Sequence, residues 1–397
     1  MTINRWAALV DTLIGDGKIT EMWQRPFLAV QREQFIPDMI WVIDPAGRGF
    51  VPLRKADEPD AWRSYVNADE FIVTQVDDGA PARPEGIDGY PTSSSSMPSV
   101  MAAMLAWLDL RPGQRVLEIG TSTGYNTALL CEYLGDDTLV TTVEIDPDIA
   151  EHAEKALTTA GYRPTVVCAD GEQGWPGRAP YDRVLSTAGV NVTVPYPWIE
   201  QTRPGGVIIT PWATPYLDSA LVRLGVDTGV ASGSFCGNAV FMNLRGHRRD
   251  RAVPRVDYTA AEKSYTLLHP WYASEDSTGF AFTVSVLLPD LQQDIAYDPD
   301  DRSDYELLVW DSGGSWAAVN IDNEHRQAGR FFVRQRGFRR LWNEVERAFA
   351  WWILNGKPTY HRFGLNVTAD RQWVWLDIPD HEITGVFPRG ATRPPGV

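Results

Sequence analysis

A glycine-bounded turn and an acidic residue beyond it are the first residues whose spacing indicates chemistry. An apolar run that starts at Val116 breaks at Gly120, and a second apolar run ends on Glu144. A strand, a glycine turn, a helix and a second strand form one half of a nucleotide-binding α/β fold. Glycines let the backbone approach a ligand, and a carboxylate at the second strand's end can accept hydrogen bonds from both ribose hydroxyls. The pattern predicts a nucleoside site around Gly120 and Glu144.

The composition of the turn narrows the choice of nucleoside. Its sequence from Gly120 to Gly124 is G-T-S-T-G, without the central glycine of a G-x-G-x-x-G motif. That glycine allows the backbone to approach a pyrophosphate, so its absence disfavours a dinucleotide. A nucleoside without phosphates fits better, and S-adenosyl-L-methionine is the usual one.

Two other interpretations of the same turn stay open at this point. The five residues also match G-x-S-x-G, the turn that exposes a serine nucleophile in α/β-hydrolases, and His247 and His269 follow downstream. No HGGG-like oxyanion segment precedes the turn, however, and Glu144 has no role in a hydrolase. The plainest alternative is an ordinary strand-to-helix turn with an incidental glutamate.

The bulk properties exclude several classes of protein. The chain has 397 residues and a net charge of −16, which disfavours nucleic acid as a partner. No apolar run is long enough for a transmembrane helix, and the N-terminus has no signal-peptide pattern. Cys131, Cys168 and Cys236 lack metal spacing and are expected to be buried, reduced thiols, which favours the cytoplasm. Six scattered histidines predict no metal site.

The elements expected around the turn alternate regularly. Strands are predicted at 115–119, 139–144, 164–168, 182–187 and 206–210, and helices at 98–110, 124–134, 147–160 and 195–202. Apolar runs at 220–224 and 239–244 have no helix between them and predict an antiparallel hairpin at the sheet edge. The fold class is therefore α/β, with a doubly wound, Rossmann-like sheet.

The two ends of the chain differ from this core. Near the N-terminus, helical spacing is seen at Trp6, Leu9, Val10, Leu13 and Ile14. A second helix is expected to start at Arg25-Pro26, to include 27–30 and to end at 35–37, and 77–91 is expected to be a surface loop. We predict an N-terminal helical cap over 1–95, a Rossmann-like core over 96–245, and a second, α+β domain over 246–397.

The C-terminal domain is rich in tryptophan and is preceded by a basic segment. Residues 270–397 hold eight of the sixteen tryptophans, and Phe338, Leu341, Trp342, Val345, Phe349 and Trp352 keep helical spacing. Such a face is more often core than binding site. The segment with arginines at 245, 248, 249, 251 and 255 is likewise interpreted as a solvated linker, which is more common than a docking patch.

Five motifs in order resemble the protein-L-isoaspartate O-methyltransferase family over about residues 5–245. They are V-L-E-I-G-T-S-T-G-Y at 116–125, V-E at 143–144, A-D-G-E-Q-G-W at 169–175, A-P-Y-D at 179–182 and T-R-P-G-G-V-I-I-T-P at 202–211. The resemblance implies S-adenosyl-L-methionine as cofactor, with Asp170 accepting from the adenine amino group. The implied cofactor residues are Glu118, Gly120, Thr121, Ser122, Gly124, Tyr125, Glu144, Ile145, Asp170 and Gly171.

The family's substrate motif T-I-S-A-P-H aligns with Ser94 to Ser99, so serine replaces its threonine and its histidine. Ser94, Ser95 and Ser96 are therefore the candidate catalytic residues. Their hydroxyls can hold one oxygen of a carboxylate and leave the other facing a methyl group, and an ionised carboxylate needs alignment rather than a general base. Alternatively, Ser96 only caps the helix that follows.

The altered substrate motif and the added domain resemble one branch of this family. Those C-terminally extended members act in the biosynthesis of ribosomally made, modified peptides such as graspetides, lanthipeptides and lasso peptides. The resemblance implies an O-methyltransferase that esterifies an aspartate of a constrained peptide, after which the ester forms an aspartimide. The partner is then a peptide or protein with an Asp or isoAsp carboxylate. Isoaspartate repair is the alternative, followed by a non-catalytic cofactor-binding adaptor.

Overall fold

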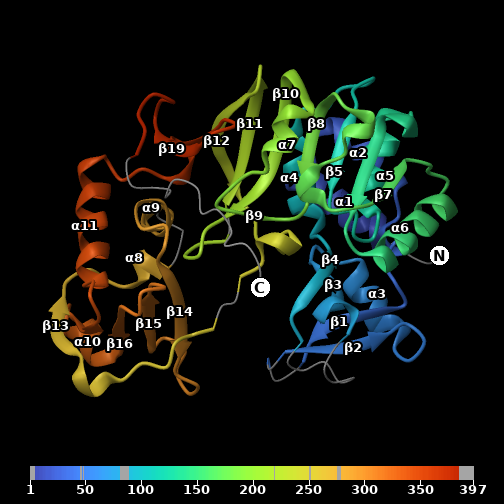
Figure 1. Cartoon of the computed structure of the whole chain (residues 1–397). Coiled ribbons are helices and arrows are strands. Elements are labelled where there is room, and N and C mark those ends of the chain that lie inside the picture. The colour runs from blue at the N-terminus through green and yellow to red at the C-terminus, as the bar shows by residue number, and fades with distance from the viewer. Residues whose placement is uncertain are drawn as a thin grey trace.

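The computed structural model describes residues 5–44, 47, 49–80, 89–218, 220–249, 252–274 and 279–383. Figure 1 shows a large sheet flanked by helices, with a small N-terminal sheet and a C-terminal sheet below it. Two parts of the predicted organisation lie outside the described residues: Arg251 of the basic segment and residues 81–88 of the surface loop.

The main sheet confirms the predicted doubly wound fold. Within the described residues its order is β19-β18-β12-β11-β10-β8-β5-β6-β7, and β9 pairs with β10. The strands are β5 (Val116–Ile119), β6 (Val140–Glu144), β7 (Thr165–Cys168), β8 (Tyr181–Ser186), β9 (Val190–Asn191), β10 (Thr202–Ala213), β11 (Ala220–Asp227), β12 (Val230–Asn238), β18 (Phe363–Val367) and β19 (Gln372–Leu376). Strands β7, β6, β5, β8 and β10 are parallel, and the strand order reverses between β5 and β8. Ligands of such sheets bind at this reversal.

Helices cover both faces of this sheet because its central strands are buried on both sides. Neighbouring residues Val116 and Leu117 of β5 belong to two different core clusters. The first cluster contains side chains of α1 (Arg5–Gly15), α2 (Glu21–Ala29), α4 (Pro98–Leu108), α5 (Tyr125–Leu134) and α6 (Pro147–Ala160). The second contains side chains of α7 (Tyr196–Glu200) and α9 (Phe280–Leu287).

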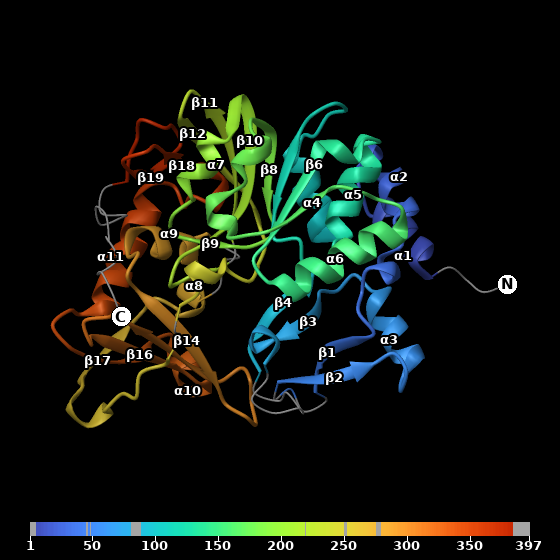
Figure 2. The same ribbon diagram turned by 45° about the vertical axis from the view of Figure 1, so that its right-hand side comes forward.

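The N-terminal part contains a sheet that the sequence analysis missed. Its order is β2-β1-β3-β4, and helix α3 packs on it. These elements are β1 (Met39–Ile43), β2 (Phe50–Arg54), α3 (Pro59–Val66), β3 (Ile72–Val76) and β4 (Pro91–Ser95). Strand β4 consists of proline, threonine and serines, so it lacks the apolar alternation by which strands are predicted. Figure 2 shows β4 directly beneath the main sheet.

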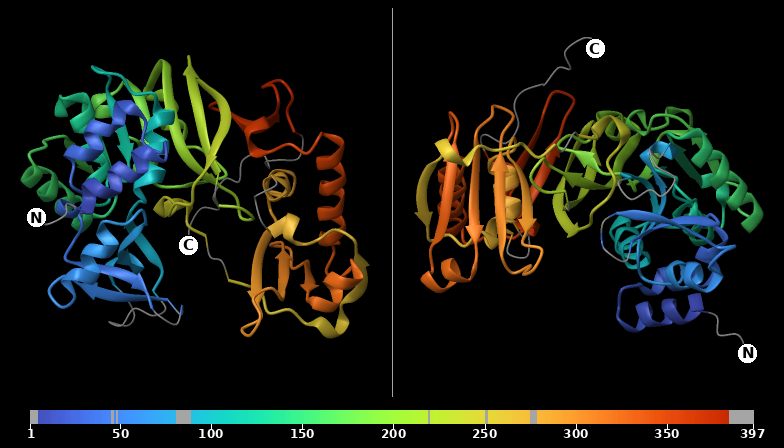
Figure 3. Two further views of the ribbon diagram at one scale, coloured as in Figure 1. Left: turned by 180° about the vertical axis from the view of Figure 1, so that it is seen from behind. Right: turned by 90° about the horizontal axis from the view of Figure 1, so that it is seen from below.

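The C-terminal part forms a five-stranded antiparallel sheet in the order β13-β17-β16-β15-β14. Its elements are β13 (Glu262–Thr266), α8 (Trp271–Ser274), β14 (Gln292–Tyr297), β15 (Tyr305–Trp310), β16 (Trp316–Ile321), α10 (Asn323–Ala328), β17 (Phe331–Arg336) and α11 (Leu341–Leu354). Trp342 and Trp352 are buried between α11, α9 and this sheet, as expected of a core face. Figure 3 shows the sheet from behind and from below.

Three expectations about these elements need correction. The second strand of the edge hairpin is β12, so residues 239–244 form a loop after it. Helix α2 starts at Glu21 and includes Pro26, which was expected to start a helix. Strands β18 and β19 of the predicted C-terminal domain extend the main sheet through β12, so this part of the chain does not fold apart from the core. Cys168 is exposed, whereas Cys131 and Cys236 are buried.

Candidate active site

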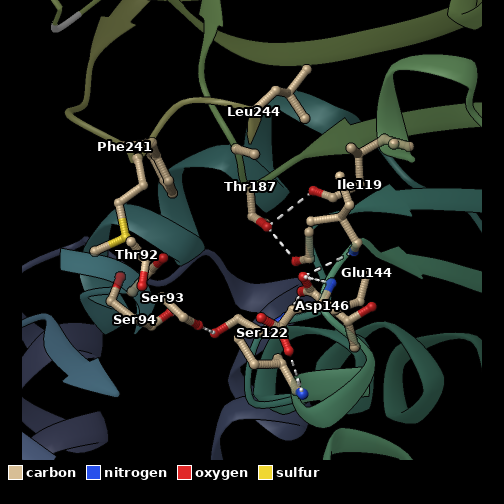
Figure 4. A pocket seen from close by; sticks show the side chains of 18 of the residues that line it. Thr92, Ser93, Ser94, Ile119, Ser122, Glu144, Asp146, Thr187, Phe241 and Leu244 are labelled. Carbon is tan, nitrogen blue, oxygen red and sulfur yellow. Dashed lines mark hydrogen bonds between the residues drawn. The ribbon is translucent and has the colours of Figure 1, made fainter. Parts of the chain in front are cut away.

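A cavity of about 110 Å³ opens where the strand order reverses. Its walls come from β4, the loop after β5, the end of β6, the loops after β7 and β8, and residues 241–248 (Figure 4). Of the predicted cofactor residues, those that line it are Gly120, Thr121, Ser122, Tyr125, Glu144, Ile145, Asp170 and Gly171.

The glycine turn is shaped by close backbone approach. Gly120 has φ +91°, and a side chain there would place its Cβ 2.7 Å from Thr187 Oγ1. That hydroxyl donates to the carbonyls of Ile119 and Gly120, at 3.1 and 2.5 Å. Only glycine satisfies both conditions at this position. Ser122 also has a positive φ, of 48°, which is uncommon for a residue with a side chain.

Glu144, the residue expected to bind a ribose, lies at the edge of the cavity. It ends β6 and lines the cavity, and its carboxylate accepts from the backbone N–H groups of Ser122, Ile145 and Asp146 at 2.9, 3.0 and 3.2 Å. Burial raises the pKa of Glu144, while these three hydrogen bonds act in the opposite direction. Oε1 already accepts two of these bonds and Oε2 accepts one, so Oε2 retains acceptor capacity for a hydroxyl donor.

Two of the predicted cofactor residues lie behind the cavity. Glu118 is fully buried, and its carboxylate accepts from Asn126, Thr127 and Thr142 at 2.6, 2.5 and 2.7 Å. It therefore joins β5, α5 and β6 beneath the site, and burial raises its pKa. Gly124 has φ +82° at the start of α5 and packs against Leu157 of α6. Both residues support the loop instead of lining the cavity.

The candidate serines divide between the two sides of β4. Ser94, Ser95 and Ser96 all line the cavity, but the Ser95 side chain is buried and its Oγ accepts from Arg32 Nε at 3.2 Å. Ser94 and Ser96 are the two that also face a second cleft. The interpretation of Ser96 as a helix cap is wrong, because the residue that caps α4 is Met97.

The second cleft, which we call the acceptor cleft, adjoins the first cavity. The two share Ser94, Ser96 and residues 241–243. The acceptor cleft measures about 410 Å³ and is mostly apolar. Its other lining residues are Phe50, Phe71, Tyr90, Pro91, Met97, Val100, Asp218 and Val240. A ligand in each cavity would meet its neighbour at the two serines.

The arginine segment does more than link two domains. Arg245 donates to Asp78 at 3.1 Å and to Asp146 at 3.3 Å, and Arg248 binds Asp78 at 2.7 Å. Both arginines line the first cavity, so the interpretation of this segment as a solvated linker is wrong for them. Gln75 also donates to Asp146, at 3.2 Å. Burial by itself raises the pKa of Asp146, but the hydrogen bonds from Gln75, Arg245 and the α6 backbone outweigh burial, so this pKa is lowered.

Sequence reasoning also missed the apolar walls of the cavity. Ile119, Ile149 and Leu244 line it from three separate segments. Leu244 was expected to end a strand, and the others belong to ordinary apolar patterns, so their types carry no signal. The arginine cluster was a usable signal, because charges of one sign beside a predicted acidic site often pair with it.

The first cavity has donors and acceptors that fit S-adenosylmethionine. Glu144 and Asp170 supply carboxylates, and Ile119 and Leu244 supply apolar surface for an aromatic base. The lining residues Tyr125 and Asn126 each have a buried oxygen without a hydrogen-bond partner, Oη and Oδ1 respectively. Buried polar atoms are normally paired, and an ammonium group such as that of methionine would satisfy such acceptors.

The geometry does not support a serine hydrolase. Ser122 Oγ donates to the carbonyl oxygen of Ser94 at 2.8 Å and lies 3.1 Å from Ser93 Oγ. His247 Nδ1 instead accepts from the backbone N–H of Asn191 at 2.9 Å. A nucleophilic serine needs a base within hydrogen-bond reach, and the described contacts give Ser122 none.

The sheet, the glycine turn and the carboxylate at the end of β6 define an α/β methyltransferase. Residues 82–244 match the family model described as protein-L-isoaspartate(D-aspartate) O-methyltransferase. The chain is 31% identical to the protein-L-isoaspartate O-methyltransferase of Pyrococcus horikoshii over 222 residues, which are 55% of this chain and 83% of that protein. The corresponding protein of Thermococcus sibiricus is 32% identical over 223 residues, with the same coverage of 55% and 83%. The chain therefore belongs to the protein-L-isoaspartate O-methyltransferase family.

This membership confirms an enzyme that methylates protein carboxyl groups with S-adenosylmethionine as cofactor. A solved structure titled protein-L-isoaspartate O-methyltransferase aligns with 94% of this chain and 99% of its own, at 22% identity and a TM-score of 0.53. That likeness confirms the fold and includes the C-terminal part.

The described residues offer neither a metal-binding cluster nor a helix that could span a membrane. They contain no cluster of three or more histidine, cysteine, aspartate or glutamate side chains that could hold a metal ion. No helix among them is long and apolar enough to cross a membrane.

Proposed function

We propose that this enzyme methylates a carboxylate of an aspartate-derived residue in a peptide or protein, with an isoaspartyl residue as the first candidate. The observation that carries the proposal is the junction of two cavities at Ser94 and Ser96. One cavity has the groups that a nucleoside cofactor needs, and the other is open, apolar and large enough for peptide side chains. Family membership supports the same chemistry.

The residues at the junction suit methyl transfer to an anion. S-adenosylmethionine, when bound, supplies a methyl group already activated for displacement. Ser94 and Ser96 would donate hydrogen bonds to one carboxylate oxygen and leave the other free to attack. Phe241 and Met242, which line both cavities, would exclude water from the junction. A carboxylate is ionised at neutral pH, so no side chain has to remove a proton, and alignment supplies much of the acceleration, about 7–11 kcal/mol in favourable cases.

A second candidate substrate is an aspartate in a ribosomally made, constrained peptide. Ser99 stands where the family motif has histidine, and exposed Phe71, Tyr90 and Val240 line an acceptor cleft wider than a single side chain requires. The methyl ester would then react with the following backbone nitrogen, lose methanol and close an aspartimide. This second step needs no enzyme group.

The C-terminal domain does not separate the two candidates. A structure titled protein-L-isoaspartate O-methyltransferase aligns with nearly the whole chain, so the domain is not peculiar to peptide biosynthesis. We propose that residues 246–397 take part in substrate recognition, with tryptophan and arginine side chains in contact with the peptide. Asp218 supports this, because it lines both the acceptor cleft and a smaller cavity formed with Gln293 and Asp294 of β14.

A direct assay tests both candidates. Purified enzyme is given labelled cofactor with a linear isoaspartyl peptide, the matching aspartyl peptide, or a cyclised precursor peptide, and methyl addition and methanol loss are followed by mass. Turnover of the isoaspartyl peptide alone supports the first candidate, and turnover of the cyclised peptide alone supports the second. Cofactor binding without transfer to any peptide indicates a non-catalytic adaptor and contradicts the proposal.

A further inference from the structure

Arg32 lies behind the serine strand and is fully buried. It follows α2 in a short 3-10 helix and reaches across to β4. Its Nε donates to Ser95 Oγ at 3.2 Å, and its Nη2 donates to the carbonyls of Ser95 and Ser96 at 3.1 and 2.9 Å. The remaining bonds from its guanidinium go to the carbonyls of Val66, Ala68 and Glu70 at 3.4, 3.2 and 3.0 Å.

Among the described residues no carboxylate bonds directly to this guanidinium, although the charge of nearby Asp69 favours its cationic form. All six hydrogen-bond acceptors are hydroxyl or carbonyl oxygens, and the ion pairs among the described residues do not include Arg32. Burial lowers its pKa to about 10, so it remains a cation at neutral pH. A buried cation whose direct hydrogen bonds all go to uncharged oxygens is costly for a fold, which suggests a role beyond packing.

Among the described residues, the acceptor cleft has no positive charge of its own. Its thirteen lining residues include no lysine, arginine or histidine, although its proposed ligand is an anion. The start of α4 could attract an anion, but the backbone N–H of Ser99 already donates to Asp69 at 2.9 Å. Arg32, directly behind Ser95 and Ser96, is the cation bonded to this strand.

We propose that Arg32 is a positioning residue for methyl transfer, which fixes the strand end presenting Ser94 and Ser96 and supplies the positive field that holds the acceptor carboxylate. This inference rests on the proposed function. Arg32 does not touch the acceptor, so it cannot form an ion pair that would make the carboxylate less nucleophilic.

The test compares two ligands that differ in charge alone. Wild-type enzyme saturated with S-adenosylhomocysteine is titrated with a short isoaspartyl peptide and with the same peptide carrying a carboxamide in place of the acceptor carboxylate. The preference for the carboxylate is the ratio of the two dissociation constants. This ratio does not depend on the fraction of enzyme that is folded. Arg32→Lys keeps the charge, Arg32→Gln removes it, and the exposed Arg25→Gln is the matched control.

We expect Arg32→Gln to lower the preference for the carboxylate at least fivefold, while Arg32→Lys and Arg25→Gln retain it. Arg32→Lys should still lower kcat, because an ammonium group cannot hold all six oxygens. If Arg32→Gln does not fold, Arg32→Lys decides the test. Loss of the preference for the carboxylate in Arg32→Lys, which keeps the positive charge, overturns the inference. An unchanged preference in a folded Arg32→Gln also overturns it, and the proposed function then stands. If the wild type neither binds nor methylates the isoaspartyl peptide, the first candidate substrate fails, and the cyclised precursor peptide with its carboxamide counterpart then decides the inference in the same way.

Discussion

Ser122 Oγ donates a 2.8 Å hydrogen bond to the carbonyl oxygen of Ser94, and this contact joins the cofactor loop to the acceptor strand. The backbone N–H of the same residue donates to Glu144. Ser122 stands where a G-x-G-x-x-G motif has its central glycine, and it keeps a glycine-like φ of 48°. Its side chain therefore connects two parts of the site that glycine would leave separate.

Substituting Ser122 should separate the effect of the hydrogen bond from that of backbone strain. Ser122→Ala loses the bond and keeps the unfavourable φ, so we expect a loss of about 1 kcal/mol in the free energy of unfolding. Ser122→Gly loses the same bond but relieves about 1 kcal/mol of strain, and should be about as stable as the wild type. Both should lower turnover, because both lack the hydroxyl. Urea unfolding and single-turnover kinetics measure the two effects, and full activity of either variant would contradict the coupling.

Glu144→Gln should weaken cofactor binding by about 1.5–3 kcal/mol, since the charge-assisted bonds to the ribose hydroxyls are lost. Titration with S-adenosylhomocysteine measures this, and Glu151→Gln on the exposed face of α6 is the control for charge. Glu144→Ala should in addition lower stability, because three backbone N–H groups lose their acceptor. Equal affinity in Glu144→Gln and the control would mean that Glu144 supports the loop only.

The raised pKa of Glu144 makes cofactor affinity depend on pH. The ribose hydroxyls need an ionised acceptor, so affinity should fall as the pH drops through the raised pKa, above the usual range for glutamate. The effect on stability has the opposite sign: a carboxyl group with a raised folded-state pKa stabilises the free enzyme at low pH, and this contribution is lost as the pH rises through that pKa. Titrations with S-adenosylhomocysteine across the acidic range should show the slope in the wild type and lose it in Glu144→Gln.

The pair Arg245 and Asp78 should be energetically coupled, but weakly. Both side chains are partly exposed, and ion pairs of this kind contribute about 0–1 kcal/mol. A double-mutant cycle with Arg245→Gln and Asp78→Asn, read out as cofactor affinity, should give a coupling of that size that shrinks with added salt. Additive effects at low salt would show that Arg245 acts on the cavity through Asp146 alone.

The core of the fold could be predicted because its elements are marked locally. Strand β5 is mostly apolar, β6 is rich in β-branched residues, and Asp146 caps α6 immediately before a proline. Strand β4 escaped because its Thr and Ser side chains resemble a loop, and it is a strand only through pairing with β3. Glu144 was placed correctly in the site because a strand end fixes its position.

The different roles of Ser94, Ser95 and Ser96 could not be predicted, because they depend on a residue far away in sequence. Arg32 lies 63 residues before Ser95 and takes its hydroxyl as an acceptor. Glu118 was assigned to the cofactor by its motif, but strand alternation turns its side chain beneath the turn, toward Thr127 and Thr142. Tertiary contacts decide such cases.

The three serines should therefore respond differently to alanine. Ser94 and Ser96 face both cavities, so Ser94→Ala and Ser96→Ala should lower kcat with little change in cofactor affinity or stability, and together they should lower it further. Ser95→Ala removes an acceptor from a buried guanidinium and should cost about 1–3 kcal/mol of folding free energy. The exposed Ser264→Ala is the control.

Methyl transfer at saturating cofactor and peptide gives kcat, titration with S-adenosylhomocysteine gives affinity, and urea unfolding gives stability. Wild-type turnover in the Ser94→Ala, Ser96→Ala double variant would place the acceptor elsewhere in the cleft. A purely catalytic loss in Ser95→Ala, with unchanged stability, would mean that its hydroxyl serves the acceptor more than it serves Arg32. The pattern expected from the structure is the reverse, because Ser95 is buried against Arg32 while its two neighbours border the open cleft.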